Sequence, residues 1–482
     1  MNVDTASLES MCELIVDCPH STPKWTDSGV VVLRNQNIRN GQLELSSPSY
    51  TNEAGYQSRV KRAVPQVGDI IFTREAPMGE VCLIPSGLKC CLGQRQVLLR
   101  PKETVNGEYL YWALQSPFVQ HQISWNEGTG TTVSNVRIPV LKSLQIPRRG
   151  SDEQKIADAL SSLAHKIRLN HQINQTLEQI AQALFKSWFV DFEPVKAKIA
   201  ALETGGSDED ALLAAMQAIS GTSLFDADAS AAGTEAQLAR LQAERPEQYA
   251  ELRATAKLFP SAMQDSELGE IPEGWEVKPL SEMIKLIGGG TPKKSEPSFW
   301  NGKIHWFSIK DIPAEGNVFV IDTTDKITDE GLKRSSTRLL PVGTTIITAR
   351  GTVGKLALTG VATAMNQSCY GVIGSEGTGP YLNYLRLHNA LDTLKQNTHG
   401  AVFDTITQST FETVIQSLAD LTLRERFERT VEPLFKQIKN NLIQSKILSE
   451  TRDLLLPKLL SGELSVSDTD ARLAEVEEPA NV

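Results

Sequence analysis

Several marks of membrane, secreted and metal-binding proteins are missing from this sequence. No stretch reaches the roughly 18 consecutive apolar residues that a membrane span needs. The first 14 residues lack the basic-then-apolar pattern of a secretory signal, and the seven histidines are scattered along the chain. We therefore expect a cytoplasmic protein without a metal site.

The six cysteines are unevenly distributed and include no CxxC pair. Cys90 and Cys91 could join Cys82 as zinc ligands. Because paired spacing is absent, reduced and partly buried thiols in a pair of strands are the favoured interpretation. The remaining cysteines are Cys12, Cys18 and Cys369.

Motifs of several enzyme classes are also absent. There is no GxxxxGK[ST] loop, and the glycine run 288–290 is followed by TPKK at the wrong spacing to cradle a phosphate. HExxH, GxSxG and the Pro-Pro-aromatic motif of amino-methyltransferases are missing too. We expect no catalytic residue and no bound cofactor in this chain.

The acidic residues are concentrated in two segments. The chain has 482 residues, enough for two to four domains, and a net charge of −10. Residues 197–268 account for −7 of this charge and residues 461–482 for −5, so the rest of the chain is left with +2. The overall sign therefore does not exclude a nucleic-acid partner.

The sequence contains an internal repeat. Residues 67–74 return as residues 342–350 at an offset of 275, and the Gly93-Gln94 pair returns as Asn366-Gln367. Residues 109–112 match residues 381–384, and the last part of each copy matches at a constant offset of 271. Two copies of one domain are therefore expected.

Each copy ends in an apolar heptad pattern. Steps of three and four residues predict a helix over about 152–189, with an equal seam from Phe427 to Leu459. Neither helix can bury its seam alone, so we predict a coiled coil; two core helices in separate domains are the alternative. Pro433 should start or kink the second helix. The predicted seam residues are Ile156, Leu160, Leu163, Ile167, Asn170, Leu177, Leu184, Phe427, Val431, Leu434, Ile438, Asn441, Leu448 and Leu455.

The predicted fold class is α/β (α+β): two similar mixed domains joined by two long antiparallel helices in a coiled coil, with pseudo-twofold symmetry. Strands are expected at 30–33, 69–72, 96–99 and 345–348, and short helices at 109–122 and 381–395. The expected parts are a first mixed domain (1–150), a long helix (151–194), an acidic, alanine-rich linker (195–268), a second mixed domain (269–422), a second long helix (423–462) and an acidic tail (463–482). The linker is interpreted as a linker or surface helix, with a dedicated docking element as the alternative.

The turn-rich regions carry side chains suited to reading bases. Arginine, lysine, asparagine and glutamine can distinguish guanine from adenine in the major groove, and residues 34–40 (RNQNIRN) form the densest such run. For each residue taken alone, an ordinary solvated surface remains the alternative. The candidate DNA-binding residues are Lys24, Arg34, Asn35, Asn37, Arg39, Arg59, Lys61, Arg62, Arg74, Gln94, Arg95, Thr291, Lys293, Lys294, Trp306, Lys310, Arg350 and Gln367.

This order of parts resembles the specificity subunit of type I restriction-modification enzymes over nearly the whole chain. The segments that carry the resemblance are IGGGTP at 287–292, WNG at 300–302, IHW at 304–306, GDII at 68–71, GEV at 79–81, LFKSWFVDFEP at 184–194 and DSELGEIPEGW at 265–275. One departure is the first copy, where residues 17–25 (DCPHSTPKW) replace the Gly-Gly-Thr-Pro form and leave the geometry of that loop open.

The resemblance implies that each mixed domain is a target-recognition domain for one half of a split, asymmetric DNA sequence, with the helices setting the gap. It also implies two methyltransferase subunits and motor-nuclease subunits as partners. S-adenosylmethionine, ATP and Mg²⁺ would then belong to those partners. The alternatives are a coiled-coil scaffold without DNA specificity and a fused nuclease or methyltransferase with degenerate motifs.

Overall fold

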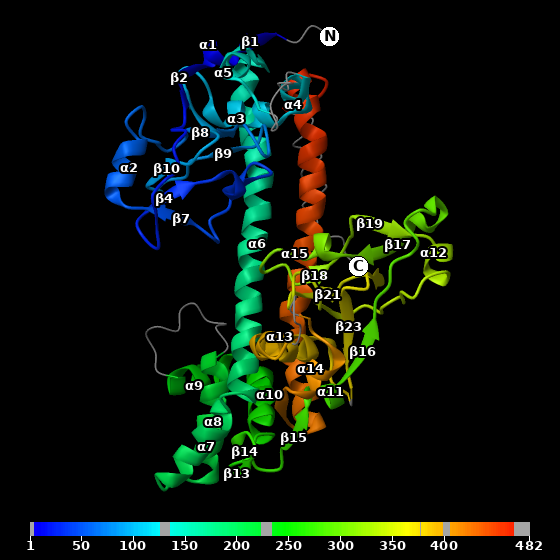
Figure 1. Ribbon diagram of the computed structural model, residues 1–482. Helices are drawn as coiled ribbons and strands as arrows, with labels where there is room; N and C mark the ends of the chain where they lie inside the picture. The colour runs from blue at the N-terminus through cyan, green and yellow to red at the C-terminus, as the bar shows by residue number, and fades with distance from the viewer. Residues whose placement is uncertain (1–3, 126–134, 223–233, 376, 399–404, 467–482) are drawn as a thin grey trace. The chain divides into compact units, whose positions relative to one another are not determined.

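The computed structural model describes residues 4–125, 135–222, 234–375, 377–398 and 405–466 (Figure 1). It divides into unit 1, residues 1–167 and 446–482, and unit 2, residues 168–445. The acidic tail expected from residue 463 lies outside the described residues from 467 onward. None of the helices in these ranges combines the length and the apolar character that a membrane span requires.

Unit 1 is built around an antiparallel sheet of four strands. Their order is β2 (Cys12–Asp17), β11 (Gln96–Pro101), β8 (Ile70–Thr73) and β9 (Val81–Leu83). Every residue of β8 is buried because both faces of the sheet are covered: Ile70 and Phe72 pack in one core and Ile71 in another, which explains the continuous apolar run. Helix α3 (Gly107–Gln115) and the short helix α1 (Leu8–Met11) contribute to the same core.

A second sheet in unit 1 has the order β10 (Cys90–Leu92), β4 (Val30–Leu33), β7 (Ser49–Thr51) and β3 (Trp25–Thr26). Its neighbours are α2 (Glu53–Arg59) and the hairpin of β5 (Ile38–Arg39) and β6 (Gln42–Leu43). Strand β1 (Thr5–Ser7) pairs with β12 (Gln145–Pro147), which follows α5 (Ile138–Ser143). Cys82, Cys90 and Cys91 are free and buried, and burial raises the pKa of Cys82 and Cys90 to about 12, so both remain thiols.

The helix expected over 109–122 is interrupted. It consists of α3 and α4 (Pro117–Trp125). Pro117 has no backbone N–H with which to continue α3, and the Ser116 hydroxyl accepts a hydrogen bond from the Val119 amide. The sequence pattern missed this break because the apolar spacing continues through it.

Unit 2 repeats the architecture of unit 1. Its main sheet has the order β16 (Ile284–Gly288), β23 (Cys369–Gly374), β20 (Thr345–Thr348), β21 (Leu356–Thr359) and β18 (Phe319–Val320). Ile71 lies opposite Leu98 and Cys82 in unit 1, and Ile346 lies opposite Gly371 and Ala357 in unit 2. The offsets between these partners are those of the sequence repeat, so the duplication is confirmed at the level of register.

The smaller elements of unit 2 also have counterparts in unit 1. A three-stranded sheet contains β19 (Asp325–Ile327), β17 (Trp300–Phe307) and β22 (Thr363–Met365), flanked by α12 (Asp329–Lys333). Strand β15 (Glu276–Pro279) pairs with β24 (Ile415–Leu418). Helices α11 (Leu280–Met283), α13 (Pro380–Gln396) and α14 (Gln408–Glu412) correspond to α1, α3 and α5.

Two long helices contribute to both units: α6 (Glu153–Phe189) and α15 (Leu421–Ser461). In unit 1, Ile156, Leu160 and Leu163 of α6 share one core with Leu448 and Leu455 of α15. In unit 2, the corresponding core contains the predicted seam residue Leu184 of α6, with the half-buried Leu177 packed against it. The predicted seam residues of α15 in this core are Phe427, Val431, Leu434 and Ile438. The alternative of two core helices in separate domains is therefore wrong.

The helix pair in unit 2 is antiparallel. Asn170 of α6 contacts Gln444 of α15, whereas Phe185, further along α6, contacts the earlier Phe427. Pro433 does not start α15, which begins twelve residues before it. The preceding turns remain helical because Phe427 and Val431 are buried in the core, so tertiary packing offsets the cost of the proline.

Three asparagines form a buried hydrogen-bonded cluster between the two helices of unit 2. Asn170 Nδ2 donates to Gln444 Oε1 at 2.8 Å, and Asn441 Nδ2 donates to Asn174 Oδ1 at 2.8 Å. Asn174 Nδ2 in turn donates to the Ile438 carbonyl at 3.4 Å. An axial shift of either helix would leave these buried amides without partners, so the cluster favours one register.

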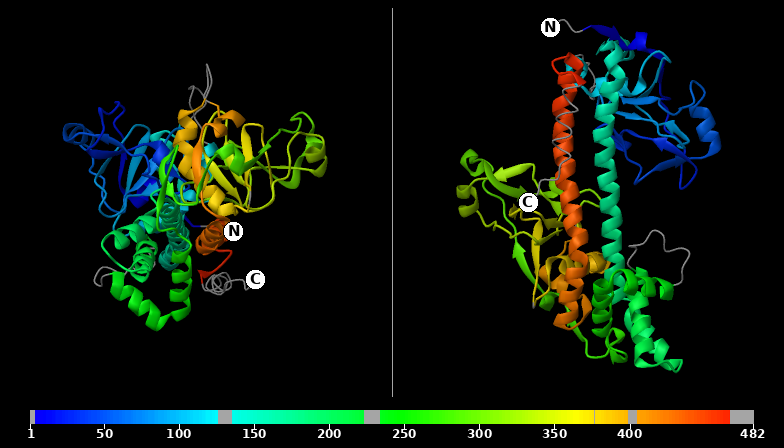
Figure 2. Two further views of the ribbon diagram at one scale, coloured as in Figure 1. Left: turned by 90° about the horizontal axis from the view of Figure 1, so that it is seen from below. Right: turned by 180° about the vertical axis from the view of Figure 1, so that it is seen from behind.

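The segment expected as a linker is a helical module. It contains α7 (Glu193–Glu203), α8 (Asp208–Thr222), α9 (Thr234–Glu244) and α10 (Pro246–Lys257), followed by a hairpin of β13 (Met263–Ser266) and β14 (Gly269–Pro272). Figure 2 shows the green helices gathered beside the C-terminal part of α6. Trp188 of α6 packs edge-on against Phe259 at 5.2 Å between ring centroids, and Met216 is buried in the same core. The alanine-rich segment therefore packs over the C-terminal end of α6.

We predict that Asn441→Leu lowers the stability of the helix pair by about 1–3 kcal/mol, because Asn174 Oδ1 and the Gln437 amide lose a buried partner. Urea unfolding followed by circular dichroism measures the shift. The matched control replaces Asn170, Asn174 and Asn441 by leucine together, and should recover stability because no buried amide is left unpaired. A single variant as stable as the original chain would contradict a role for the cluster.

Candidate nucleic-acid interface

In each unit, three connections meet at one edge of the sheet that contains β4 and β10 in unit 1 and β17 and β22 in unit 2; we call this the recognition edge. In unit 1 they are residues 18–25, the 3-10 turn Asn35–Asn37 and residues 93–95. In unit 2 they are residues 289–299, the 3-10 turn Ile309–Asp311 and residues 366–368. Strands β4 and β10 are parallel neighbours, as are β17 and β22, so the connections that follow them lie side by side.

The recognition edge of unit 1 surrounds a hollow of about 440 Å³. The Arg34 guanidinium lies 5.3 Å from the centroid of the Trp25 ring, and both side chains are exposed. Such a pair holds a guanidinium in place by a cation–π interaction, and Arg34 Nη1 also donates to Ser49 Oγ at 3.4 Å. The other N–H groups of the exposed guanidinium can bind a base or a phosphate. The other polar side chains in the lining are those of Thr22, Asn35, Gln36, Gln94 and Arg95.

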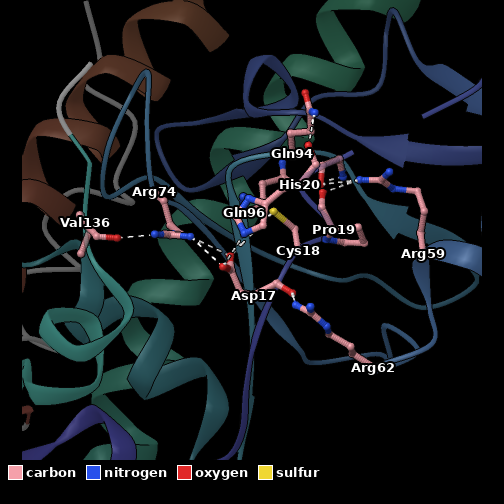
Figure 3. A network of polar contacts seen from close by, with 11 residues as sticks. Asp17, Cys18, Pro19, His20, Arg59, Arg62, Arg74, Gln94, Gln96 and Val136 are labelled. Carbon is pink, nitrogen blue, oxygen red and sulfur yellow. Dashed lines mark hydrogen bonds and ion pairs between the residues drawn. The ribbon is translucent and has the colours of Figure 1, made fainter. Parts of the chain in front are cut away.

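The loop over residues 18–25 is anchored by a buried arginine (Figure 3). Arg59 donates to the carbonyl oxygens of Leu92 at 2.6 Å and Gly93 at 2.9 Å. It also donates to the carbonyl oxygens of Ser21 at 3.0 Å and Pro19 at 3.2 Å. Arg59 therefore ties two connections of the recognition edge together. The prediction that it contacts DNA is wrong, because a buried guanidinium already bound to four carbonyls is not available to a base.

Arg74 is likewise committed to the protein. Its Nη1 lies 2.9 Å from both carboxylate oxygens of Asp17, and its Nε donates to the Val136 carbonyl at 2.9 Å (Figure 3). Asp17 is the last residue of β2, directly before the loop. Arg62 donates to the Asp17 carbonyl at 3.2 Å and remains exposed. We therefore remove Arg74 from the candidates and retain Arg62.

Two further candidates shape the recognition edges from inside. Asn37 is buried, accepts a hydrogen bond from the Arg34 amide and donates to the Glu44 carbonyl, both at 2.9 Å. Asn37 therefore caps the 3-10 turn that presents Asn35 and Gln36. Trp306 is also buried, and its Nε1 donates to the Gly290 carbonyl at 3.0 Å. Neither side chain is free to contact DNA. The prediction that Asn37 and Trp306 bind DNA is therefore wrong, and both instead stabilise the backbone of the recognition edges.

The recognition edge of unit 2 depends on close backbone contact. A Cβ atom on Gly289 would lie 1.9 Å from the Asn366 carbonyl oxygen, and one on Gly290 would lie 2.2 Å from Ser336 Oγ. The glycines therefore let residues 289–299 pack against the turn at 366–368, where Thr291 donates to Gln367. The corresponding loop of unit 1, residues 18–25, contains no glycine and is held by the Arg59 contacts instead.

The remaining candidates are distributed as follows. Exposed positions on the connections of the recognition edges hold Lys24, Arg95, Lys293, Lys294, Lys310 and Gln367, and half-exposed positions hold Asn35, Gln94 and Thr291. The exposed Arg34 directly precedes the 3-10 turn of unit 1. Asn35 donates to the Glu75 carbonyl, Gln94 donates to the His20 carbonyl at 2.6 Å, and Arg95 pairs with Glu75 at 3.2 Å. Arg39, Lys61, Arg62 and Arg350 are exposed but lie outside the three connections.

The candidate set omitted Trp25, Thr22 and Gln36, which line the hollow of unit 1. Gln36 lies inside the polar run 34–40, so its place there was a signal in the sequence. Trp25 had no comparable signal, because its position depends on the path of the anchored loop. Within the described ranges, no group of three or more histidine, cysteine, aspartate or glutamate side chains could hold a metal ion.

We predict that Arg59→Met destabilises unit 1 by about 1–3 kcal/mol, because four carbonyl groups, of which those of Leu92 and Gly93 are buried, lose their charged donor. Thermal unfolding of the full chain measures this effect. The matched variant Arg34→Met, on the exposed side of the same edge, should change stability by less than about 0.5 kcal/mol. Equal losses in the two variants would contradict the assignment of Arg59 as the internal anchor.

The comparisons with known proteins agree on one family. The model described as type I restriction modification DNA specificity domain matches residues 2–179 and 272–421. The chain is 39% identical over 333 residues to the type I restriction enzyme HindI specificity subunit of Haemophilus influenzae, covering 67% of this chain and 69% of that protein. It is 27% identical over 409 residues to the MjaIX specificity subunit of Methanocaldococcus jannaschii, covering 83% and 78%.

A solved type I restriction-modification S subunit from M. genitalium covers 95% of this chain, and 96% of that structure is covered, at 15% identity. Its TM-score of 0.49 is too low to support an inference about this chain. The family model, in contrast, spans more than half of the chain in two separate segments, one in each copy of the repeat. The chain therefore belongs to the type I restriction-modification DNA specificity family.

Proposed function

We propose that this chain is a specificity subunit that reads a bipartite, asymmetric DNA sequence and directs partner methyltransferase and endonuclease subunits to it. The observation that carries the proposal is the presence of two equivalent recognition edges with different side chains. The capping residues Asn37 and Asp311 occupy the same place in the two 3-10 turns. Gln36 therefore corresponds to Lys310, and Asn35 to Ile309.

Residues 93–95 of unit 1 and 366–368 of unit 2 also present different side chains at equivalent positions. Gln94 and Gln367 are equivalent, whereas the next residues are Arg95 and Ser368. A glutamine can bind adenine through two hydrogen bonds, and arginine or lysine can bind guanine. One scaffold that presents different donors and acceptors in its two copies suits a target whose two halves differ.

Other exposed cations suit contacts to phosphate. Lys293 and Lys294 lie on the loop of the unit 2 edge, and Lys24 lies on the loop of the unit 1 edge. Phosphate contacts supply affinity and fix the position of the protein on the duplex, whereas contacts to base edges supply specificity. We assign these three lysines the first role, and Lys310 and the amide-bearing residues the second.

The chemistry of modification and cleavage is proposed to belong to the partners. Two methyltransferase subunits would bind S-adenosylmethionine and flip the target adenine, and motor-nuclease subunits would use ATP and Mg²⁺. This chain would contribute binding energy and position, with α6 and α15 setting the gap between the half-sites. A cytoplasmic location follows from such partners.

We predict that each recognition edge controls one half-site. Gln36→Ala with Gln94→Ala should relax the first half of the target, and Lys310→Ala with Gln367→Ala the second, each by about 1–3 kcal/mol per lost base contact. Mapping methylated adenines in cells that express the complete system measures both halves together. A variant of one edge that altered both halves would contradict the assignment.

The phosphate control is Lys294→Ala. This variant should weaken binding to all sequences alike and reduce the slope of log K against log salt by about 1. Fluorescence anisotropy with duplexes at several salt concentrations measures that slope. An unchanged slope together with altered base preference would place Lys294 among the base-reading residues instead.

We also predict that the purified chain, supplied with S-adenosylmethionine and target DNA, transfers no methyl group until methyltransferase subunits are added. Tritium transfer to DNA measures this activity. Methylation by the chain alone would favour the fused-enzyme alternative and contradict the proposal.

A further inference from the structure

A buried arginine in unit 2 lacks a counter-ion. Arg386 lies in the middle of α13 and is 2% exposed. Its Nη1 atom is buried and has no hydrogen-bond partner, and no described carboxylate forms an ion pair with it. Arginine is rarely buried in proteins unless it is paired, so this side chain calls for an explanation.

The internal repeat shows that the fold itself does not require arginine at this position. Tyr109 and Tyr381 are equivalent in the two copies, and the same offset of 272 places Leu114 opposite Arg386. Leu114 is fully buried in α3, in an apolar core. A leucine therefore satisfies the packing of this helix in unit 1, and unit 2 has a charge instead.

Arg386 lines a cavity of about 200 Å³ within unit 2. Much of the wall is apolar and comes from α6, from the segment that follows it and from β14 and β24; it includes Phe185, Phe189, Phe192, Ile271 and Ile415. Gln416 also lines the cavity, and its buried Oε1 atom accepts no hydrogen bond. The cavity thus brings an unpaired cation and an unpaired acceptor together beside an apolar part of the wall.

The charge on Arg386 persists at neutral pH. Burial, together with the positive charge of Arg424, lowers its pKa to about 10, which is still well above 7. Arg424 is itself bonded to the Ala419 carbonyl and the Thr378 hydroxyl. A buried cation beside a second cation is costly, and an anion that entered the cavity would relieve that cost.

We propose that this cavity binds a carboxylate carried on an apolar peptide-like body. One carboxylate matches one guanidinium in charge and can accept two parallel hydrogen bonds from it. A neighbouring peptide N–H supplies the donor that Gln416 Oε1 lacks, and an apolar side chain fits the phenylalanine-lined wall. A phosphate would bring more charge than one buried guanidinium neutralises and no N–H donor.

Among the residues that line the cavity, Glu270 carries a carboxylate that could act as the counter-ion of Arg386. It lines the cavity, but its side chain is exposed on β14 and it forms no described ion pair with Arg386. Its negative charge at the cavity should oppose an incoming anion. Glu270→Gln should therefore strengthen the binding of a carboxylate, whereas removal of Arg386 should weaken it.

The experiment uses the full chain and N-acetyl-phenylalanine as the probe, with N-acetyl-phenylalaninamide as the uncharged match. Saturation-transfer NMR and calorimetry should show that the acid binds at least about tenfold more tightly than the amide, since a hydrogen-bonded charge pair is worth about that much. Arg386→Leu should abolish this preference, and Glu270→Gln should increase it.

Folding of the variant is tested separately. Arg386→Leu should unfold at the same or a higher temperature than the original chain, because leucine occupies the equivalent position in unit 1 and a buried unpaired charge is removed. Absence of binding by the original chain, or equal binding of the acid and the amide, would overturn the proposal. Undiminished binding of the acid by the leucine variant would also overturn it.

A second arm identifies the source of the carboxylate. If Arg386→Leu weakens assembly with purified methyltransferase subunits in analytical ultracentrifugation, the group comes from a partner protein. If assembly is unchanged while the probe binds, the source is a free small carboxylate. The half-site preferences of Arg386→Leu should stay those of the original chain, so this proposal and the proposed DNA-reading function can fail independently.

Discussion

Neither α6 nor α15 can bury its apolar seam alone, and the cores of both units depend on their contact. In unit 1 the seam residues belong to the same core as the main sheet, and in unit 2 they pack with α13 and the helical module. The seam is apolar except at Asn170, Asn174 and Asn441, where directional hydrogen bonds replace non-directional burial. Burial thus stabilises the helix pair, and the amides select its register.

The two recognition edges show how one topology is kept with different local chemistry. Unit 2 brings its loop against a neighbouring turn through Gly289 and Gly290, where a Cβ atom would not fit. Unit 1 lacks those glycines and joins the corresponding connections through the Arg59 guanidinium. In both, these contacts involve backbone atoms, and the exposed side chains are left free to differ, which allows one scaffold to present two base-reading surfaces.

The same comparison separates the requirements of the fold from additions to it. Leu114 and Arg386 occupy equivalent buried positions, and only the leucine is explained by packing. Asn37 and Asp311 differ in charge but cap equivalent turns in the same way. The two copies of a duplicated chain can therefore be compared with each other. A residue that differs between the copies but keeps its structural role does not indicate a new function. A buried charge that is present in one copy and has no counter-ion points to a further binding partner.

Periodicity and repetition in the sequence were enough to determine the duplication, the long helices, their seams and the strands of the main sheets, because these features depend on local patterns of apolar residues. The break between α3 and α4, the continuation of α15 through Pro433 and the helices of residues 193–257 depended on packing that no local pattern records. The site was less predictable still. The sequence does not distinguish an arginine or asparagine that faces solvent from one that is hydrogen-bonded to carbonyl groups inside the protein. Only the tertiary structure therefore separated the internal Arg59, Arg74 and Asn37 from the exposed Arg34 and Lys310.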